Sequence, residues 1–397
     1  MHLIEEKKNP AVAPVRAGQL RRDSPIRVAF VLHAMQVAGA EVLVMETIRT
    51  LTGQIEPTVI CLDDVGPLGE RLLGEGIEVA CLQRRPGRDP RAVWRMASVL
   101  RRRGIEIVHA HQYTPFFYAA LGALASPIHP PVIFTEHGRH HPDIVSPLRR
   151  AANKILFSRM AAAVNAVSGF SAESLREVDG FAARSIEVVE NGIEIERYER
   201  HRDRLALRER LGLDPDRTYI ANVARLHPIK DQAMLLRGFA LLAVARPDVD
   251  LLLIGEGALR GSLGRLAEDL RIADRVKFLG VRSDVAEWLA AVDIFALTSL
   301  CEAASLTLLE AMASALPVVA TAVGGTPEIV RDGIDGILVP RGDAHATAAA
   351  FQRLLDDPRA ASAMGASARE RVRSRYQLRG TIEKYREIYV RLSERRG

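Results

Sequence analysis

Short apolar runs alternate with segments of helical periodicity along most of the chain. The first run, Arg27–Leu32, is followed by a predicted helix from about Ala40 to Leu51. Apolar strands joined by helices are typical of a parallel sheet that is covered on both faces. The strands expected in this first series are Arg27–Leu32, Pro57–Leu62, Glu78–Leu82, Ile105–Ala110, Val132–Glu136, Ala162–Val167 and Ile186–Glu190.

The same alternation begins again after Asn191. The strands expected in the second series are Tyr219–Ala224, Asp250–Gly255, Val276–Leu279, Ile294–Leu297 and Val318–Ala320. The helices between them are expected to begin near Asp231, Ala258, Asp284 and Leu306. The densely charged stretch Glu194–Arg204 separates the two series and indicates a domain boundary. After Gly342 only helical patterns remain, and the last of them runs from about Gly380 to Arg395.

The pattern as a whole predicts an α/β protein with two doubly wound, Rossmann-like domains that face each other across a cleft. We expect a disordered tail at residues 1–25, an N-terminal domain at 26–195, a second domain at 196–377 and a final helix at 378–397. Ligands of doubly wound sheets bind beyond the carboxyl ends of the strands. The candidate chemistry is therefore expected in the loops that follow the strands.

Composition excludes several classes of protein. Of the 397 residues, 48% are hydrophobic and 26% are charged, which is typical of a soluble globular chain. No apolar run is long enough to cross a membrane. The three cysteines, Cys61, Cys81 and Cys301, are spaced too widely for a disulfide framework or a zinc motif. The sequence therefore predicts a cytoplasmic protein.

Positive charge is concentrated in one part of the first series. Residues 84–159 contain 13 Lys or Arg against 4 Asp or Glu, whereas the whole chain carries a net charge of +5. No nucleic-acid-binding motif accompanies this surplus, so nucleic acid is not an expected partner. Peripheral contact with the anionic inner face of a membrane is a better interpretation of the basic surplus. The alternative is a solvated basic face. The basic residues at helical spacing are Arg91, Arg95 and Arg102, and further on Arg150 and Lys154.

Two glutamates form the most specific candidate site. Glu302 lies in the loop after the strand that ends at Leu297, and Glu310 lies about one turn into the following helix. The unpaired N–H groups at the start of that helix, around Ala304–Thr307, provide an anion site. Carboxylates on either side of it could bind sugar hydroxyls. The alternative is that Glu302 interacts only with the helix dipole and that Glu310 is solvated.

A second candidate loop follows the first strand of the second series. Arg225 and Lys230 lie there before a helix that Asp231 caps. Two cations could neutralise a pyrophosphate, because Arg supplies a planar fork and Lys a point charge. The alternative is a pair of solvated loop charges.

Two features of the first series are weaker candidates. Gly39 allows close approach of the backbone to a phosphate at a helix start, or it belongs to an ordinary turn. His137 ends a strand, so it could donate a hydrogen bond to a polar substrate, or it could be a structural histidine. The histidines of this region match no metal-binding motif. They are His109, His111, His137, His140 and His141.

These pieces, in this order, resemble the retaining glycosyltransferases of family four, which have the GT-B fold. The resemblance runs from about Arg27 to Arg395 and rests chiefly on the pair of glutamates, which is followed by Ala-Met-Ala and Leu-Pro-Val-Val-Ala-Thr. Supporting segments are the Arg225–Lys230 loop, Ile254-Gly-Glu-Gly257, Phe278-Leu-Gly280, Val167-Ser168, Asn191-Gly192 and Gly324-Gly-Thr-Pro-Glu328. The family fold implies that the last helix packs back on the N-terminal domain.

The resemblance also implies a role for each candidate residue. Glu302 would bind the hydroxyls of the donor sugar and Glu310 those of the ribose. Arg225 and Lys230 would hold the pyrophosphate and stabilise the departing nucleotide. The remaining roles are the sugar and diphosphate contacts of Ala304, Ser305 and Leu306, the base contacts of Val281 and Arg282, the phosphate contact of Gly39 and the sugar contact of His137. No metal or cofactor would be needed.

The activity implied is transfer of a sugar, with retention, from a UDP- or GDP-linked donor to a glycan or lipid-linked acceptor in polysaccharide or glycolipid assembly. The residues of the glutamate motif are most similar to those of exopolysaccharide transferases. Two alternatives stay open. One is another nucleotide-sugar enzyme of the same fold, of epimerase or phosphorylase type, and the other is a non-catalytic subunit.

Overall fold

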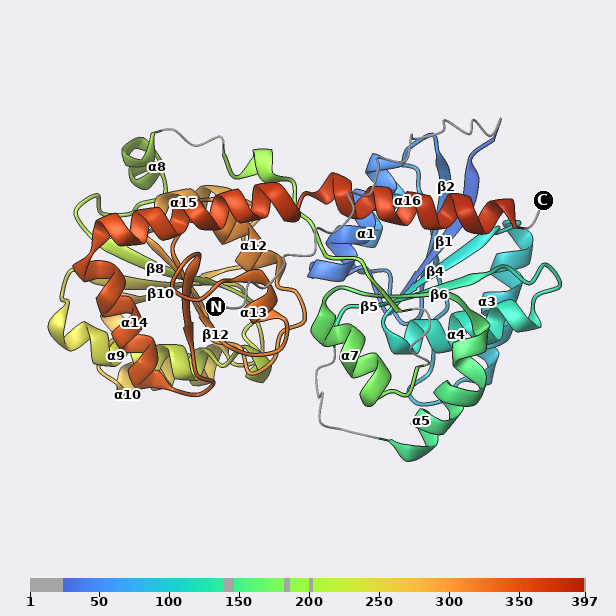
Figure 1. The fold of residues 1–397 in the computed structure, drawn as a ribbon, viewed down its shortest axis with the longest axis horizontal. Helices are drawn as coiled ribbons and strands as arrows, with labels where there is room; N and C mark the ends of the chain where they lie inside the picture. The colour runs from blue at the N-terminus through green and yellow to red at the C-terminus, as the bar shows by residue number, and fades with distance from the viewer. Residues whose placement is uncertain (1–23, 139–145, 182–185, 200–202, 396–397) are drawn as a thin grey trace, which may run out of the picture.

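The computed structural model describes residues 24–138, 146–181, 186–199 and 203–395. Figure 1 shows two α/β units side by side, with the red helices of the C-terminal end running along both. We call the sheet of β1–β7 with its helices the first unit, and the sheet of β8–β13 with its helices the second unit. The predicted doubly wound fold is confirmed, and the division of the chain at 195/196 stays a prediction.

The first unit contains a seven-stranded parallel sheet in the order β3-β2-β1-β4-β5-β6-β7. Its strands are β1 (Ile26–Leu32), β2 (Ile55–Cys61), β3 (Glu78–Cys81), β4 (Ile107–His111), β5 (Val132–Glu136), β6 (Ala161–Ala166) and β7 (Ile186–Val188). Its helices are α1 (Gly39–Thr50), α2 (Gly66–Gly74), α3 (Pro90–Arg102), α4 (Tyr113–Ala125), α5 (Pro147–Ala152), the π-helix η1 (Asn153–Phe157), α6 (Ser158–Met160) and α7 (Gly169–Glu177). The order of strands reverses between β1 and β4, which opens a ligand-binding edge at their carboxyl ends.

The second unit contains a six-stranded parallel sheet in the order β10-β9-β8-β11-β12-β13. Its strands are β8 (Thr218–Val223), β9 (Val249–Ile254), β10 (Val276–Gly280), β11 (Ile294–Leu297), β12 (Val318–Thr321) and β13 (Gly336–Val339). Its helices are α8 (Arg204–Arg210), α9 (Gln232–Ala245), α10 (Arg260–Asp269), α11 (Val285–Ala291), α12 (Leu306–Ala313), α13 (Thr326–Ile329), α14 (Ala344–Asp356) and α15 (Pro358–Arg375). Short 3-10 turns lie at η3 (Ile195–Arg197), η4 (Pro228–Lys230) and η5 (Ala273–Arg275).

The edge strand β13 is absent from the sequence prediction. It pairs with β12 from Val318 opposite Gly336 onward. Its first residue is a glycine because a Cβ at Gly336 would lie 2.4 Å from Cγ2 of Val318. Three apolar residues after a glycine are too short a run to indicate a strand by periodicity alone.

The last helix, α16 (Leu378–Glu394), returns to the first unit, as the family fold implied (Figure 1). Its buried residues Ile382, Tyr385 and Tyr389 belong to the same apolar core as Val28 and Phe30 of β1. The chain therefore passes between the units twice. The two passages are hydrogen-bonded where Ile193 donates to the Tyr376 carbonyl at 2.9 Å and accepts from Leu378 at 3.0 Å.

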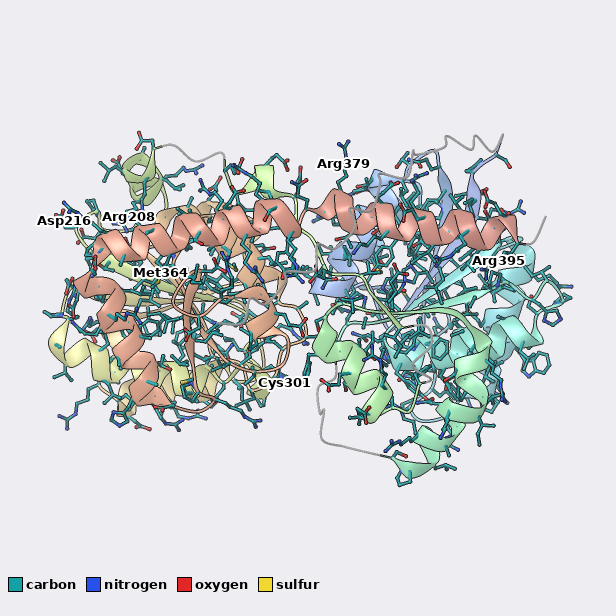
Figure 2. The ribbon with its side chains drawn as sticks, viewed as in Figure 1. Arg208, Asp216, Cys301, Met364, Arg379 and Arg395 are labelled. Atoms are coloured by element: carbon teal, nitrogen blue, oxygen red, sulfur yellow. The ribbon has the colours of Figure 1, made fainter. Side chains whose placement is uncertain are left out.

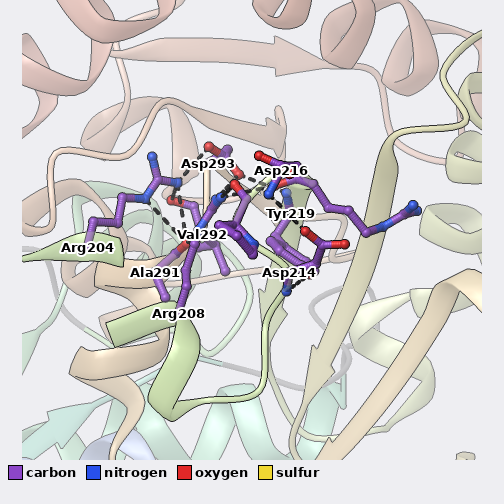
Figure 3. A network of polar contacts seen from close by, with 10 residues as sticks. Arg204, Arg208, Asp214, Asp216, Tyr219, Ala291, Val292 and Asp293 are labelled. Atoms are coloured by element: carbon purple, nitrogen blue, oxygen red, sulfur yellow. Dashed lines mark hydrogen bonds and ion pairs between the residues drawn. The ribbon is translucent and has the colours of Figure 1, made fainter. Parts of the chain in front are cut away.

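A partly buried charge network joins α8 to the second sheet (Figure 3). The Asp293 carboxylate accepts from Arg208 Nη2 at 2.7 Å, Arg204 Nη2 at 2.6 Å and the Tyr219 N–H at 2.8 Å. Arg208 also donates to the carbonyls of Ala291 and Pro215. Because Asp293 directly precedes β11 and Tyr219 lies near the start of β8, this network is at the amino edge of the sheet. It is a structural feature on the side opposite the ligand-binding edge.

Candidate functional site

The two loops that the sequence analysis treated separately form one site at the carboxyl edge of the second sheet. Lys230 Nζ donates to Oε1 of Glu302 at 2.5 Å, and Ser299 Oγ donates to the same oxygen at 2.5 Å. The Glu302 side chain is only 9% exposed and that of Lys230 19%. An ion pair at this depth fixes the position of both side chains. Ser299 was not predicted, although it lies in the same loop as Glu302.

The backbone of the Glu302 loop is held by its neighbours on both sides. Leu300 N–H donates to the Ile229 carbonyl at 2.8 Å, which joins the loop to η4. Thr321 Oγ1 donates to the Ser299 carbonyl at 2.6 Å. Figure 2 shows Cys301, the neighbour of Glu302, at the side of the second unit that faces the first. The loop that carries Glu302 therefore has a fixed backbone and lies at the side of the second unit that faces the first.

Helix α12 begins directly after this loop. Ser305 caps it, because its hydroxyl accepts from the Leu308 N–H at 3.4 Å. The first N–H groups of a helix have no intrahelical acceptor, and the helix dipole makes this end positive. The predicted backbone site at Ala304, Ser305 and Leu306 thus lies next to the Glu302–Lys230 pair, and the site can accept an anion there.

Arg225 differs from Lys230 in having no fixed partner. Its side chain is exposed, and no described residue forms an ion pair with it. The charge of Arg225 also acts on Glu41 of α1 in the first unit. Burial raises the pKa of the Glu41 carboxyl, whereas a backbone hydrogen bond and the charge of Arg225 lower it. With no ion-pair partner among the described residues, the Arg225 guanidinium can bind an anionic ligand.

Glu310 is half-buried on α12 rather than solvated. Burial raises the pKa of its carboxyl, while the Tyr198 hydroxyl and the charge of Arg197 lower it. Both partners come from the passage between the units, so this passage contacts the predicted ribose-binding residue. Tyr198 was not predicted, because no local pattern connects it with α12.

The first unit reaches this site at two glycines. A Cβ at Gly39, the first residue of α1, would lie 3.4 Å from Cδ1 of Leu306 at the start of α12. A Cβ at Gly138, which has a φ of +110°, would lie 2.5 Å from the Cβ of Ala303. The structure therefore brings Gly39 and the turn after His137 against the glutamate loop, as the candidate site requires.

His137 is held in place by another histidine. Its Nε2 lies 2.8 Å from Nδ1 of His111, and the two rings stack with centroids 5.1 Å apart. Burial lowers the pKa of His137 to about 4, so the ring is neutral at pH 7. His109 is structural, because its nitrogens lie 2.7 Å from the hydroxyls of Tyr389 and Thr135. His140 and His141 lie outside the described residues.

The predicted base-binding loop follows β10. Val281 is exposed, and Arg282 donates to both carboxylate oxygens of Asp284, at 2.9 and 2.6 Å. The loop after β9 lies next to this base-binding loop. A Cβ at Gly255 or Gly257 would lie within 2.3 Å of a carbonyl in the Arg225 loop, so only glycine fits at these two positions. Gly255 N–H also donates to the Gly280 carbonyl at 2.8 Å. The two loops therefore pack together beside the anion site, with Asp284 orienting Arg282.

Family models and curated proteins match most of this chain. Residues 203–371 match the family described as glycosyl transferases group 1, and residues 37–197 match glycosyltransferase family 4. N-acetyl-alpha-D-glucosaminyl L-malate synthase of Bacillus anthracis is 31% identical over 299 residues, which cover 74% of this chain and 77% of that protein. D-inositol 3-phosphate glycosyltransferase of Mycobacterium marinum is 40% identical over 191 residues, 46% of this chain and 40% of that protein.

A solved structure with the same fold is that of Anabaena HepE in complex with UDP and glucose. It superposes with a TM-score of 0.81 at 22% identity and covers 91% of this chain and 99% of that chain. At this level of identity, the likeness establishes the shared fold.

Proposed function

This chain belongs to glycosyltransferase family four and has the GT-B fold, and we propose that it transfers a sugar from a UDP- or GDP-linked donor to a glycan or lipid-linked acceptor. The observation that carries this proposal is the Glu302–Lys230 pair beside the start of α12, with the first unit in contact at Ala303 and Leu306. This arrangement offers a carboxylate for sugar hydroxyls and a positive region for a diphosphate in adjacent positions.

The donor's nucleotide half would bind to the second unit. Arg225, Lys230 and the backbone N–H groups at Ser305 and Leu306 would hold the diphosphate, and Glu310 would accept from the ribose hydroxyls. The base would lie against Val281 and Arg282. These groups together neutralise the nucleotide diphosphate as it leaves, which is the electrostatic stabilisation that the transfer needs. We therefore propose that the reaction requires no metal ion and no cofactor.

The sugar half would lie between Glu302 and His137. Oε1 of Glu302 already accepts two hydrogen bonds, whereas Oε2 has no partner among the described residues and can accept from a sugar hydroxyl. A carboxylate bound in this way is a poor nucleophile, so we propose that Glu302 binds the sugar. Attack from the face of the leaving group, with a phosphate oxygen taking the acceptor's proton, would retain the configuration.

Two other functions are distinguished by the same assay. An epimerase would change the sugar while leaving it on the nucleotide, and a non-catalytic subunit would release no nucleotide. We expect slow hydrolysis of one UDP- or GDP-sugar, with an α-linked product from an α-linked donor when acceptor is present, as measured by NMR. A β-linked product would contradict retention, and no release from any donor would contradict the transferase proposal.

The acceptor side of the first unit has features of a membrane-docking surface. No helix within the described residues is long and apolar enough to span a bilayer. Leu148 of α5 and Ile155 of η1 are nevertheless 75% and 64% exposed, and the exposed residues Arg150 and Lys154 lie next to them in sequence. Apolar side chains beside basic ones favour an anionic bilayer surface. On α3, Arg95 contributes less than the sequence indicated, because Asp89 binds it at 2.7 Å.

We propose that this surface docks on anionic lipid, where a lipid-linked acceptor would be presented. Flotation with vesicles of phosphatidylglycerol should show binding that weakens with salt and with the double variant Arg150→Ser, Lys154→Ser. The matched control is Arg237→Ser, Arg265→Ser on the second unit. Equal binding to neutral vesicles, or no binding to either kind, would contradict docking while leaving the transferase proposal intact.

A further inference from the structure

The segment Gly324–Glu328 connects the Glu302 loop to the first unit. At its beginning, Gly325 N–H donates to the carbonyl of Glu302 at 2.9 Å. A Cβ at Gly324 would lie 1.9 Å from the carbonyl oxygen of Glu302, and one at Gly325 would lie 2.0 Å from that of Ala303. Only glycines allow this contact, so the segment packs directly against the backbone that carries Glu302.

At its end, the same segment binds the first unit. The carboxylate of Glu328 accepts from the N–H of Gly169 at 2.8 Å and from that of Phe170 at 2.6 Å. These are the first two residues of α7, whose N-cap is Ser168. A carboxylate at a helix N-terminus gains from both the unpaired N–H groups and the helix dipole. The Glu328 side chain of the second unit thus accepts hydrogen bonds at the N-terminus of helix α7 in the first unit.

The backbone of Glu328 is fixed within the second unit. Its carbonyl accepts from Arg371 Nη2 at 2.7 Å and from the Tyr376 hydroxyl at 3.1 Å. Arg371 Nε also donates to the neighbouring carbonyl of Ile329 at 2.6 Å. The side chain therefore extends from a backbone that is fixed in the second unit, and its two bonds to α7 oppose separation of the units at this point.

We propose that Glu328 is a positioning residue that joins the two units in their closed arrangement and thereby holds the Glu302 loop against the first unit. The inference rests on the proposed function, because it assigns the closed arrangement to sugar transfer. In the proposed function the nucleotide half of the donor binds mainly to the second unit, so the affinity for free nucleotide should depend little on this contact. Transfer requires Glu302, His137 and the acceptor side together, and so depends on it.

The test compares Glu328→Ala and Glu328→Gln with wild type in three measurements on the full chain. For Glu328→Ala we expect a larger radius of gyration by X-ray scattering, a UDP or GDP affinity within about twofold of wild type, and a kcat lowered by about 10–100-fold. Glu328→Gln keeps one acceptor oxygen, so its effects should fall between those of wild type and the alanine variant. The matched control is Asp343→Asn, which alters a helix cap inside the second unit, where Ala346 N–H donates at 2.8 Å.

A second pair of variants tests the contact from the other unit. A Cβ at Gly169 would lie 3.2 Å from Oε2 of Glu328, so Gly169→Ala should displace this carboxylate and lower kcat by less than Glu328→Ala does, whereas Gly261→Ala, which meets nothing within 4 Å, should leave kcat unchanged. Unchanged scattering and kcat in Glu328→Ala, or equal losses of nucleotide affinity and kcat, would overturn the inference. The scattering and nucleotide-binding results test the contact even if no donor is turned over, so its failure is distinguishable from failure of the proposed function.

Discussion

The two edges of the second sheet both carry partly buried charges, but the partners of these charges differ. At the amino edge, Asp293 accepts from two arginines and a backbone N–H, so the protein itself satisfies its carboxylate. At the carboxyl edge, Glu302 has one oxygen bound by Lys230 and Ser299 and the other without a partner among the described residues. Arg225 nearby is exposed. The first arrangement stabilises the fold, whereas the second keeps binding capacity for a ligand.

The largest expected effect is on stability, at the amino edge. Asp293→Ala would leave Arg208 buried without its counter-charge, and we expect a loss of about 3 kcal/mol in the free energy of unfolding. Chemical denaturation measures this loss, and kcat per folded molecule should stay unchanged. As a control, Asp248→Ala removes a surface pair with Arg246 and should cost less than about 1 kcal/mol. A loss of transfer in folded Asp293→Ala would contradict the separation of the two edges.

Glu302→Ala should have the reverse profile at the carboxyl edge. We expect transfer to fall by roughly 100-fold or more, because the hydrogen bonds to the sugar are lost at the reacting centre. The affinity for free UDP or GDP should stay within about threefold, since the sugar is absent from these ligands. Turnover assays and calorimetry measure the two quantities. If nucleotide binding disappeared in this variant, Glu302 would belong to the nucleotide site instead.

The strands and loops at both edges of the second sheet could be predicted from the sequence, but the contacts between them could not. Apolar runs such as Val318–Ala320 identify strands, and the carboxyl-end rule places Glu302 and Lys230 at the same edge. Their direct pairing joins residues 72 positions apart, and the bond from Gly169 to Glu328 spans 159 positions. Periodicity fixes the type of an element and the face that it buries. It contains no information on which loops of two separate sheets oppose each other.

The side-chain partners of individual candidate residues could not be predicted either. Asp284 accepts from Nε and Nη2 of Arg282, but a spacing of two residues in a loop does not by itself indicate such a pair. Likewise, the partner of His137 is His111, on the neighbouring strand β4. The His111–His137 pair depends on β4 and β5 being neighbours in the sheet, which the apolar pattern of each strand does not specify.

Glu310→Ala sharpens the comparison within the carboxyl edge itself. Because the ribose is present in donor and free nucleotide alike, affinity for UDP or GDP should fall by about 10–100-fold. Tyr198→Phe removes the hydroxyl beside Glu310 while keeping the buried ring, and should weaken binding by less than about tenfold. Glu268→Ala, at an exposed position of α10, is the matched control. Unchanged nucleotide affinity in Glu310→Ala would show that Glu310 is not the ribose-binding residue.

The smallest expected effect is that of removing metal ions. At the amino edge, the Asp293 carboxylate is neutralised by Arg204 and Arg208. At the carboxyl edge, we propose that Arg225, Lys230 and the start of α12 supply the positive charge that a leaving diphosphate requires. Transfer should therefore survive EDTA with less than about a twofold change, whereas Arg225→Ala should lower kcat by about 10-fold or more. Loss of transfer in EDTA that Mn²⁺ or Mg²⁺ restores would mean that these groups do not neutralise the diphosphate alone.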